Sequence, residues 1–218
     1  MRRPALATGV FAFLVAAGAP LVAGADPIAF KLLPNPSRAS FKSDAPLETF
    51  VGTAAGGGLA GTLVADPAKP AGTSGQVKVD LNTVSTGVSK RDADMRSKEY
   101  LDTEAAEANR WAIFDIKSVD IAGPLQPGKE TPAKVRGTLT IRGKSVDTVA
   151  DARVVYIKLT PEQLEGGQKR FGLTSDNLKV RANLETTFTN HGMQVPQLFF
   201  LKVNNSIQLE TDLTFVKQ

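Results

Sequence analysis

The sequence predicts an all-β fold of about eight antiparallel strands, and two observations support this prediction. From Phe41 onward, apolar residues alternate with polar ones, so each segment buries one face and exposes the other to water. Between these segments lie connections rich in Gly and Pro, such as residues 66–75 and 122–132. A closed barrel or a two-sheet sandwich would bury the apolar faces, and the alternation leaves both open.

The N-terminus has the three parts of a secretory signal peptide. The chain opens MRR, continues with an apolar run from Ala5 to Val22, and reaches the small residues AGA at 23–25. An uncleaved membrane anchor is the alternative, since the apolar run is nearly long enough to span a bilayer. Pro20 and the small-residue site favour cleavage after Ala25. We therefore expect residues 1–25 to be a cleaved signal peptide.

Cleavage would leave a short leader over residues 26–36 and a single domain over residues 37–218, exported to the periplasm or secreted. The chain has no Cys, so neither a disulfide framework nor an acyl-lipid anchor on the new N-terminus is available. No later segment is apolar enough to span a membrane once the signal peptide is removed.

Charge and composition argue against two other classes of exported or basic protein. The whole chain has a net charge of +4, and losing Arg2 and Arg3 without any acid leaves +2. So small an excess does not predict binding to nucleic acid or another polyanion. An outer-membrane barrel needs aromatic girdles at both rims. With 6% aromatic residues, one Trp and two Tyr, the sequence favours a soluble exported protein.

The alternation is clearest in four segments, and two local features refine the strand pattern. In WAIFDIKSVDI the phase slips between Ile116 and Val119, which predicts a bulge or bend. The stretch RGKS, Arg142–Ser145, predicts a tight hairpin. The segments with the clearest alternation are residues 77–82, 135–142, 178–188 and 207–215.

A helix is predicted near Ser89–Leu101, with a weaker turn at Thr103–Asn109. Ser89 is a suitable N-cap, with Asp92 in the capping-box position. The pairs Asp92–Arg96 and Asp94–Lys98 have the i,i+4 acid-before-base spacing that stabilises helices. Val88 and Met95 give only a narrow apolar seam. Such a helix would lie over a sheet edge or across a barrel mouth.

No set of residues suited to catalysis or metal binding emerges. Gly56, Gly58 and Gly61 match G-x-G-x-x-G, but a strand ending in Pro67 follows where a nucleotide site needs a helix. His191 is the only histidine and lies in an apparent turn, so we expect a surface imidazole without a partner for zinc or a triad. We therefore predict no enzyme activity, no metal and no cofactor.

The charged segment TGVSKRDADMRSKEYLD, residues 86–102, closely resembles the T-G-x-x-x-R-D-x-H-[LM]-R-S-x-[DE]-[FY]-[LF]-D segment of the YceI-like family. Three further pieces follow the family's order: SRASFKSDAPLETFVG (37–52), GQVKVDLNTVSTG (75–87) and GTLTIRG (137–143). The resemblance implies an extended eight-stranded antiparallel barrel, lipocalin-like, with one short helix across the rim. It also implies an exported bacterial protein that binds polyisoprenoid or similar long-chain lipids.

Two departures from the family pattern affect the rim. Asp94 stands where the family often has His, so any role of that imidazole is absent here. Phe114 follows Asp102 by twelve residues without the family's usual Tyr-Pro, where the family places a Phe about nine residues on. We therefore expect the lid over residues 103–113 to be longer and differently shaped.

The resemblance implies a non-catalytic carrier for an isoprenoid, quinone or fatty-chain lipid. It further implies that Arg91, Asp92 and Arg96 matter to the fold, and we interpret them as a brace that holds the helix against the rim. Headgroup contact is the alternative for these three residues. The inward apolar residues predicted to bind the lipid are Phe41, Phe50, Val79, Leu81, Phe114, Leu139, Ile141, Leu184, Leu209 and Leu213.

A barrel with a plugged lumen, acting as a periplasmic interaction or stress-protective protein, is the rival interpretation, and an enzyme acting on a bound isoprenoid is the third. Alternation shows which residues face inward but not whether the centre is hollow. Small inward residues favour a cavity. Exposed strand edges would also permit a homodimer. The small inward positions are Ala39, Gly61, Ala65, Gly137 and Ala182.

Overall fold

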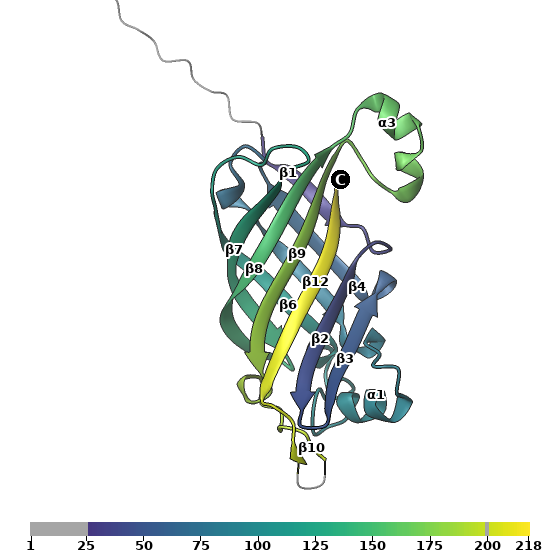
Figure 1. The fold of residues 1–218 in the computed structure, drawn as a ribbon, viewed down its shortest axis with the longest axis vertical. Coiled ribbons are helices and arrows are strands. Elements are labelled where there is room, and N and C mark those ends of the chain that lie inside the picture. The colour runs from purple at the N-terminus through teal and green to yellow at the C-terminus, as the bar shows by residue number, and fades with distance from the viewer. Residues whose placement is uncertain (1–25, 199–200) are drawn as a thin grey trace, which may run out of the picture.

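The computed structural model describes residues 26–198 and 201–218 as one antiparallel β-barrel with short helices at its ends (Figure 1). The predicted signal peptide, residues 1–25, lies outside the described residues. The sheet is formed by β1 (Ile28–Leu32), β2 (Arg38–Ala45), β3 (Glu48–Ala55), β4 (Leu59–Ala65), β5 (Ser74–Asp80), β6 (Trp111–Ile121), β7 (Glu130–Ile141), β8 (Lys144–Lys158), β9 (Asp176–Thr187) and β12 (Ser206–Lys217).

The long strand β12 closes the barrel. Its C-terminal part pairs with β1, and its N-terminal part pairs with β2. Strand β1 in turn pairs with β4, and β2 pairs with β3. Strands β1 and β2 therefore share one position around the barrel, and β3 and β4 share the next. The ten strands of the sheet thus occupy eight positions, which confirms the predicted eight-stranded barrel. Strand β1 lies within residues 26–36, which the sequence analysis had assigned to a leader.

The finer strand predictions are confirmed. The pairing of β6 with β7 shifts register between Ile116 and Ser118, where the alternation slips. Strands β7 and β8 meet in a two-residue turn at Arg142 and Gly143, with Ile141 opposite Lys144. Both turn residues have a positive φ, at 51° and 65°, which is the geometry that matches the twist of a hairpin.

Two apolar clusters fill the two ends of the barrel. The upper cluster lies toward the C-terminus in Figure 1, and the lower cluster lies toward helix α1 (Ser89–Arg96). The buried residues of the upper cluster are Phe30, Leu32, Ala39, Leu59, Leu63, Ala65, Leu125, Tyr156, Leu178, Leu213 and Phe215. Those of the lower cluster are Ala54, Leu81, Val84, Leu101, Leu139, Ile141, Met193 and Ile207.

The upper end of the barrel is sealed. Leu125, in the connection between β6 and β7, is buried there, and its amide donates to the Pro67 carbonyl at 2.8 Å. The buried Tyr156 hydroxyl donates to the Asp176 carboxylate at 2.5 Å, and Lys217 lies 3.6 Å from the same carboxylate. Burial and the Asp176 charge raise the pKa of the Tyr156 phenol, so it remains a donor at neutral pH.

The helices lie at the barrel ends, as the sequence predicts for one of them. Helix α1 lies beside β3 at the lower rim, and α2 (Glu107–Arg110) precedes β6 (Figure 1). The capping prediction for Ser89 is wrong: the N-cap is Val88, and Asp92 instead accepts hydrogen bonds from residues before the helix. Helix α3 (Pro161–Glu165) was not predicted, and it projects from the upper end. The remaining elements are short: η1 (Gly56–Gly58), η2 (Pro70–Gly72), η3 (Leu81–Thr83), η4 (Gln168–Phe171), η5 (Thr189–His191), β10 (Gln197–Leu198) and β11 (Leu201–Lys202).

The prediction of a surface imidazole at His191 is wrong, because the side chain is fully buried. Its Nδ1–H donates to the Lys144 carbonyl at 3.0 Å, and its Nε2 accepts from the Thr186 hydroxyl at 2.8 Å. These bonds tie η5 to the start of β8 and to β9. The burial of the ring lowers the pKa of His191 below its usual 6.5.

This buried histidine predicts a loss of stability in mild acid. Below pH 6.5 His191 becomes protonated in the unfolded chain, whereas in the folded protein it stays neutral until the pH reaches its own, lower pKa. The free energy of unfolding should therefore fall by up to about 1.4 kcal/mol per pH unit as the pH drops through this window. Denaturant melts of wild type and His191→Gln between pH 7.5 and 5 measure the difference. Because the chain has a single histidine, equal slopes in both proteins would contradict the prediction.

Candidate functional site

A row of small side chains crosses the inner wall of the barrel. Its members lie directly opposite one another on five neighbouring strands, so they form one continuous band. The rows on either side are bulkier, with Leu209 and Leu184 toward the lower cluster and Leu213 and Val180 toward the upper. The row consists of Ala39, Thr211, Ala182, Ala152 and Ala133. Over these five strands the inner wall is therefore lined by small groups between the two apolar clusters.

Many inward side chains beside this row are only half-buried. On β9, Val180, Ala182 and Leu184 follow one another on the inner face, and all three keep part of their surface exposed. Thr211 and Leu209 on β12 do the same. The lower cluster also has half-buried aromatic neighbours, Phe41, Phe114 and Phe188 among them. Because these groups face inward, their exposed surface opens into the barrel or toward its lower end.

Glycines let aromatic rings lie flat against the wall. A Cβ on Gly52 would lie 2.3 Å from a ring atom of Phe41, and one on Gly137 would lie 2.6 Å from the ring of Phe114. Each ring therefore covers the inner face of a neighbouring strand where a side chain is missing.

Replacing Gly52 with Ala tests this arrangement. The three atoms nearest to the new methyl group all belong to the Phe41 ring, at 2.3–3.0 Å, so the ring must leave the wall. We expect a loss of about 1–3 kcal/mol in the free energy of unfolding from overpacking, and weaker uptake of a fluorescent fatty-acid probe. Gly57→Ala is the matched control, since nothing lies within 4 Å of its Cβ position. Equal behaviour of the two variants in melts and titrations would contradict the expected ring displacement.

The residues predicted to bind lipid gather mainly at the lower end. Leu213 belongs to the upper cluster, and Phe50 belongs to neither, because its ring lies at the rim, 4.8 Å from the Arg91 guanidinium. The predicted lipid-binding set did not include Phe30, Tyr156 and Phe215, which the upper cluster contains. That the predicted residues contact a ligand stays a prediction. Those placed in or against the lower cluster are Phe41, Val79, Leu81, Phe114, Leu139, Ile141, Leu184 and Leu209.

Polar contacts hold α1 against β3 at this end. The buried Asp92 carboxylate accepts from the Ser85 hydroxyl at 2.8 Å, and from the Thr86 amide and hydroxyl at 2.8 and 2.6 Å. Ser85 itself is bridged to Thr53 of β3. The Thr86 bonds hold the pKa of Asp92 below its usual value. The helix is therefore attached through a carboxylate that stays charged at neutral pH.

The neighbouring arginines extend these contacts. Arg91 pairs with Glu48 of β3 at 2.6 Å, and Arg96 donates to the Val84 carbonyl at 2.8 Å. The predicted i,i+4 pair of Asp94 with Lys98 is replaced by a pair with Lys90 at 3.2 Å, because Asp94 turns toward the start of the helix. These contacts agree with the interpretation of Arg91, Asp92 and Arg96 as a brace, which stays a prediction.

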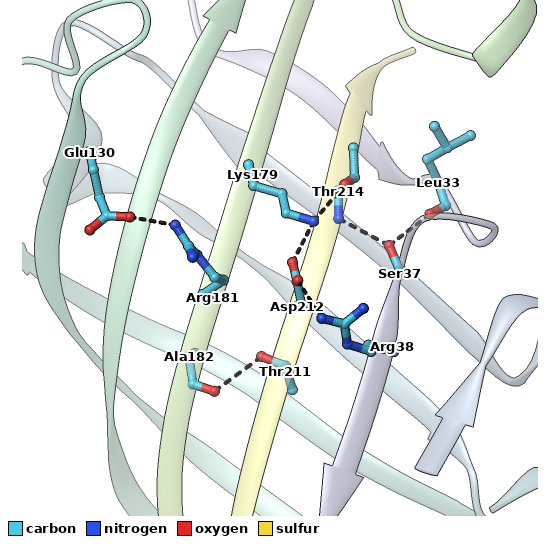
Figure 2. Close-up of polar contacts among 10 residues, drawn as sticks. All are labelled: Leu33, Ser37, Arg38, Glu130, Lys179, Arg181, Ala182, Thr211, Asp212 and Thr214. Atoms are coloured by element: carbon cyan, nitrogen blue, oxygen red, sulfur yellow. Dashed lines mark hydrogen bonds and ion pairs between the residues drawn. The ribbon is translucent and has the colours of Figure 1, made fainter.

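The outer wall differs from the inner wall in chemistry. Figure 2 shows β9, β12 and β2 from outside, where Arg181 pairs with Glu130 at 2.6 Å and Arg38 pairs with Asp212 at 3.1 Å. Lys179 pairs with the same Asp212. Arg38, Glu130, Arg181 and Asp212 line a groove on the outer surface. A groove lined by paired charges is unsuited to an apolar chain, so the interior is the better candidate site.

Within the described part of the chain, no helix is both long and apolar enough to cross a membrane.

Comparison with known proteins identifies the fold. A domain from Saccharophagus degradans, described as polyisoprenoid-binding and implicated in plant cell wall breakdown, superposes with a TM-score of 0.62 at 16% identity, over 88% of this chain and 99% of that one.

Two other solved structures share the architecture. BcnA of Burkholderia cenocepacia has a TM-score of 0.60 and 18% identity, over 82% of this chain and 95% of its own. A YCEI protein of Campylobacter jejuni has a TM-score of 0.55 and 17% identity, over 73% and 82%. No curated protein matches the sequence. The model of the YceI-like domain matches residues 30–215, almost the whole barrel, and the chain therefore belongs to the YceI-like family.

Proposed function

We propose that this protein is an exported, non-catalytic carrier that holds a polyisoprenoid or similar long-chain lipid inside the barrel. The supporting observation is the inner wall, where small residues separate two apolar clusters and neighbouring side chains keep exposed surface. An extended hydrocarbon chain would bury that surface. The relative from Saccharophagus degradans, described as binding polyisoprenoid, supports the same ligand class.

Burial of the lipid chain would supply enough free energy for this role. Each buried methylene contributes ~0.8 kcal/mol, so about twelve give roughly 10 kcal/mol before the costs of association. Association costs several kcal/mol, because the lipid loses translational freedom and side chains become ordered. The remaining free energy corresponds to a dissociation constant of about 1 μM. A carrier forms and breaks no covalent bond, so the proposal requires no catalytic group.

Mass spectrometry of an organic extract tests the proposal. The protein should be exported by its own signal peptide and purified without detergent, so that a ligand acquired in the cell is retained. We expect a prenyl, quinone or fatty-chain species in about equimolar amount. The extract of a matched Ala182→Phe preparation, in which the interior is narrowed, should contain much less of it.

An empty extract would not by itself separate an unloaded carrier from a plugged barrel. The same protein is therefore titrated with added polyprenyl lipid. Failure to take up lipid in both experiments would contradict the carrier proposal and favour the rival, a barrel whose outer surface serves as an interaction or stress-protective surface. Cleavage of the exported chain after Ala25 is tested separately, by mass spectrometry of the N-terminal peptide of the purified protein.

A further inference from the structure

The lower rim contains two buried polar atoms that have no hydrogen-bond partner within the described residues, the Arg96 Nε and the Thr103 Oγ1. Thr103 is only 5% exposed. The backbones of the two residues meet, because the Thr103 amide donates to the Arg96 carbonyl at 3.3 Å. An unpartnered buried polar group costs about 1–3 kcal/mol, so two together in one short segment call for an explanation.

These atoms border the lower end of the barrel interior. Arg96 also donates through Nη2 to the carbonyl of Val84, which is buried in the lower cluster. Leu101, two residues before Thr103, belongs to that cluster, and Met95, beside Arg96 in α1, packs against it. The segment that contains both residues therefore packs against the lower cluster, next to the lower end of the barrel.

The chemistry of the two atoms defines the group that would satisfy them. An Arg Nε–H can only donate, and a Thr hydroxyl can donate to the same oxygen. Arg91 and Arg110 each have a carboxylate partner, at 2.6 Å in both cases. Arg96 forms no ion pair within 4.0 Å among the described residues, and its charge acts on Asp80 and Asp92 only from a longer distance. A carboxylate, phosphate or carbonyl oxygen would complete the set, and an ammonium or a bare hydrocarbon end would not.

We propose that Arg96 and Thr103 bind the acceptor oxygen at the polar end of the lipid, so that this carrier selects chains ending in a hydrogen-bond acceptor. The inference rests on the proposed carrier function. Because both atoms are closed off from water, the segment Val84–Thr103 must move outward to admit the ligand. Among the described residues, that movement would break the Thr53–Ser85 pairing and the Arg91–Glu48 ion pair that hold the segment to β3, so the contacts of the bound ligand must offset their loss.

Palmitate and hexadecylamine test the proposal, because they share an apolar chain and differ in the polar end. Wild type should bind palmitate at least about tenfold more tightly than the amine. Thr103→Val should weaken palmitate about fivefold and leave the amine unchanged. Arg96→Lys, which keeps the charge without an Nε donor, should weaken palmitate by a similar factor. Thr62→Val, on the exposed outer face of β4, is the matched control.

The stability of Thr103→Val separates a ligand role from a structural one. Replacing an unpartnered hydroxyl with a methyl group should leave the melting temperature unchanged or higher. A destabilised variant that loses both probes, or variants that bind palmitate as wild type does, would overturn the inference while leaving the carrier function standing. If wild type bound neither probe, nor any polyprenyl lipid, the proposed function itself would fail and this inference with it.

Discussion

Ala182→Phe is expected to weaken the binding of a long-chain lipid about a hundredfold or more. Ala182 faces inward at the middle of the small-residue row, with Thr211 on one neighbouring strand and Ala152 on the other. A phenyl ring there would occupy the space between the two apolar clusters. If that space is hollow, the ring fills a void, and the free energy of unfolding should stay unchanged or increase. Lipid titration and denaturant melts measure the two effects.

The adjacent position on the same strand supplies the control. Asn183 faces outward and is exposed, so Asn183→Phe adds the same ring without touching the interior. Lipid affinity should be that of wild type. A plugged barrel predicts the opposite pattern for Ala182→Phe, because overpacking a filled core costs about 1–3 kcal/mol. Lost stability together with unchanged lipid uptake would therefore refute the carrier interpretation.

Asp92→Ala is expected to lower the free energy of unfolding by about 2–4 kcal/mol. The substitution leaves three hydrogen-bond donors on Ser85 and Thr86 without their acceptor. It also removes the contacts that connect α1 to β3 through Ser85. Urea melts at pH 7 measure the loss. Asp94→Ala, on the same helix, removes only an exposed pair with Lys90 and should change stability by less than about 1 kcal/mol. Similar losses in the two variants would show that Asp92 is no special anchor.

The same residue predicts an acid dependence with a defined sign. Its hydrogen bonds from Thr86 lower the pKa of Asp92 below the usual 3.8, so the folded protein binds this proton less readily than the unfolded chain. The stabilisation is complete above 3.8 and is lost as the pH falls through the lowered pKa. The stability difference between wild type and Asp92→Ala should therefore shrink below pH 4. A difference that stays constant down to pH 2 would contradict this assignment.

Local features of the sequence predicted most of the strands, because a strand's two faces follow from a period of two along the chain. The slip near Ile116 and the turn at Arg142 and Gly143 were readable for the same reason. The missed helix α3 also had a local signal, since Thr160 and Gln163 form a capping box with Pro161 at the first turn. These residues are typical of a helix N-terminus, but they lie between two strands, where the sequence analysis expects only a turn.

Contacts between residues that are far apart in the chain could not be predicted from the sequence. His191 follows a turn in the sequence, yet η5 folds it against Lys144 and removes it from water. Asp92 was assigned to the helix's own cap and ion pairs, whereas its partners precede the helix and connect it to β3. In both cases the hydrogen-bonding capacity was evident, but the partner was chosen by tertiary packing.

The sequence by itself determined that the chain forms an all-β barrel of the YceI-like family, because alternation and the segment at residues 86–102 are local properties. It also determined which side chains face inward. Only the tertiary structure decided which inward residues meet. Strand register placed Ala182 beside Thr211 and Ala152, and closure through β12 placed that row between the two apolar clusters. Register and closure are set by pairing across the whole sheet, and no short stretch of sequence contains that information.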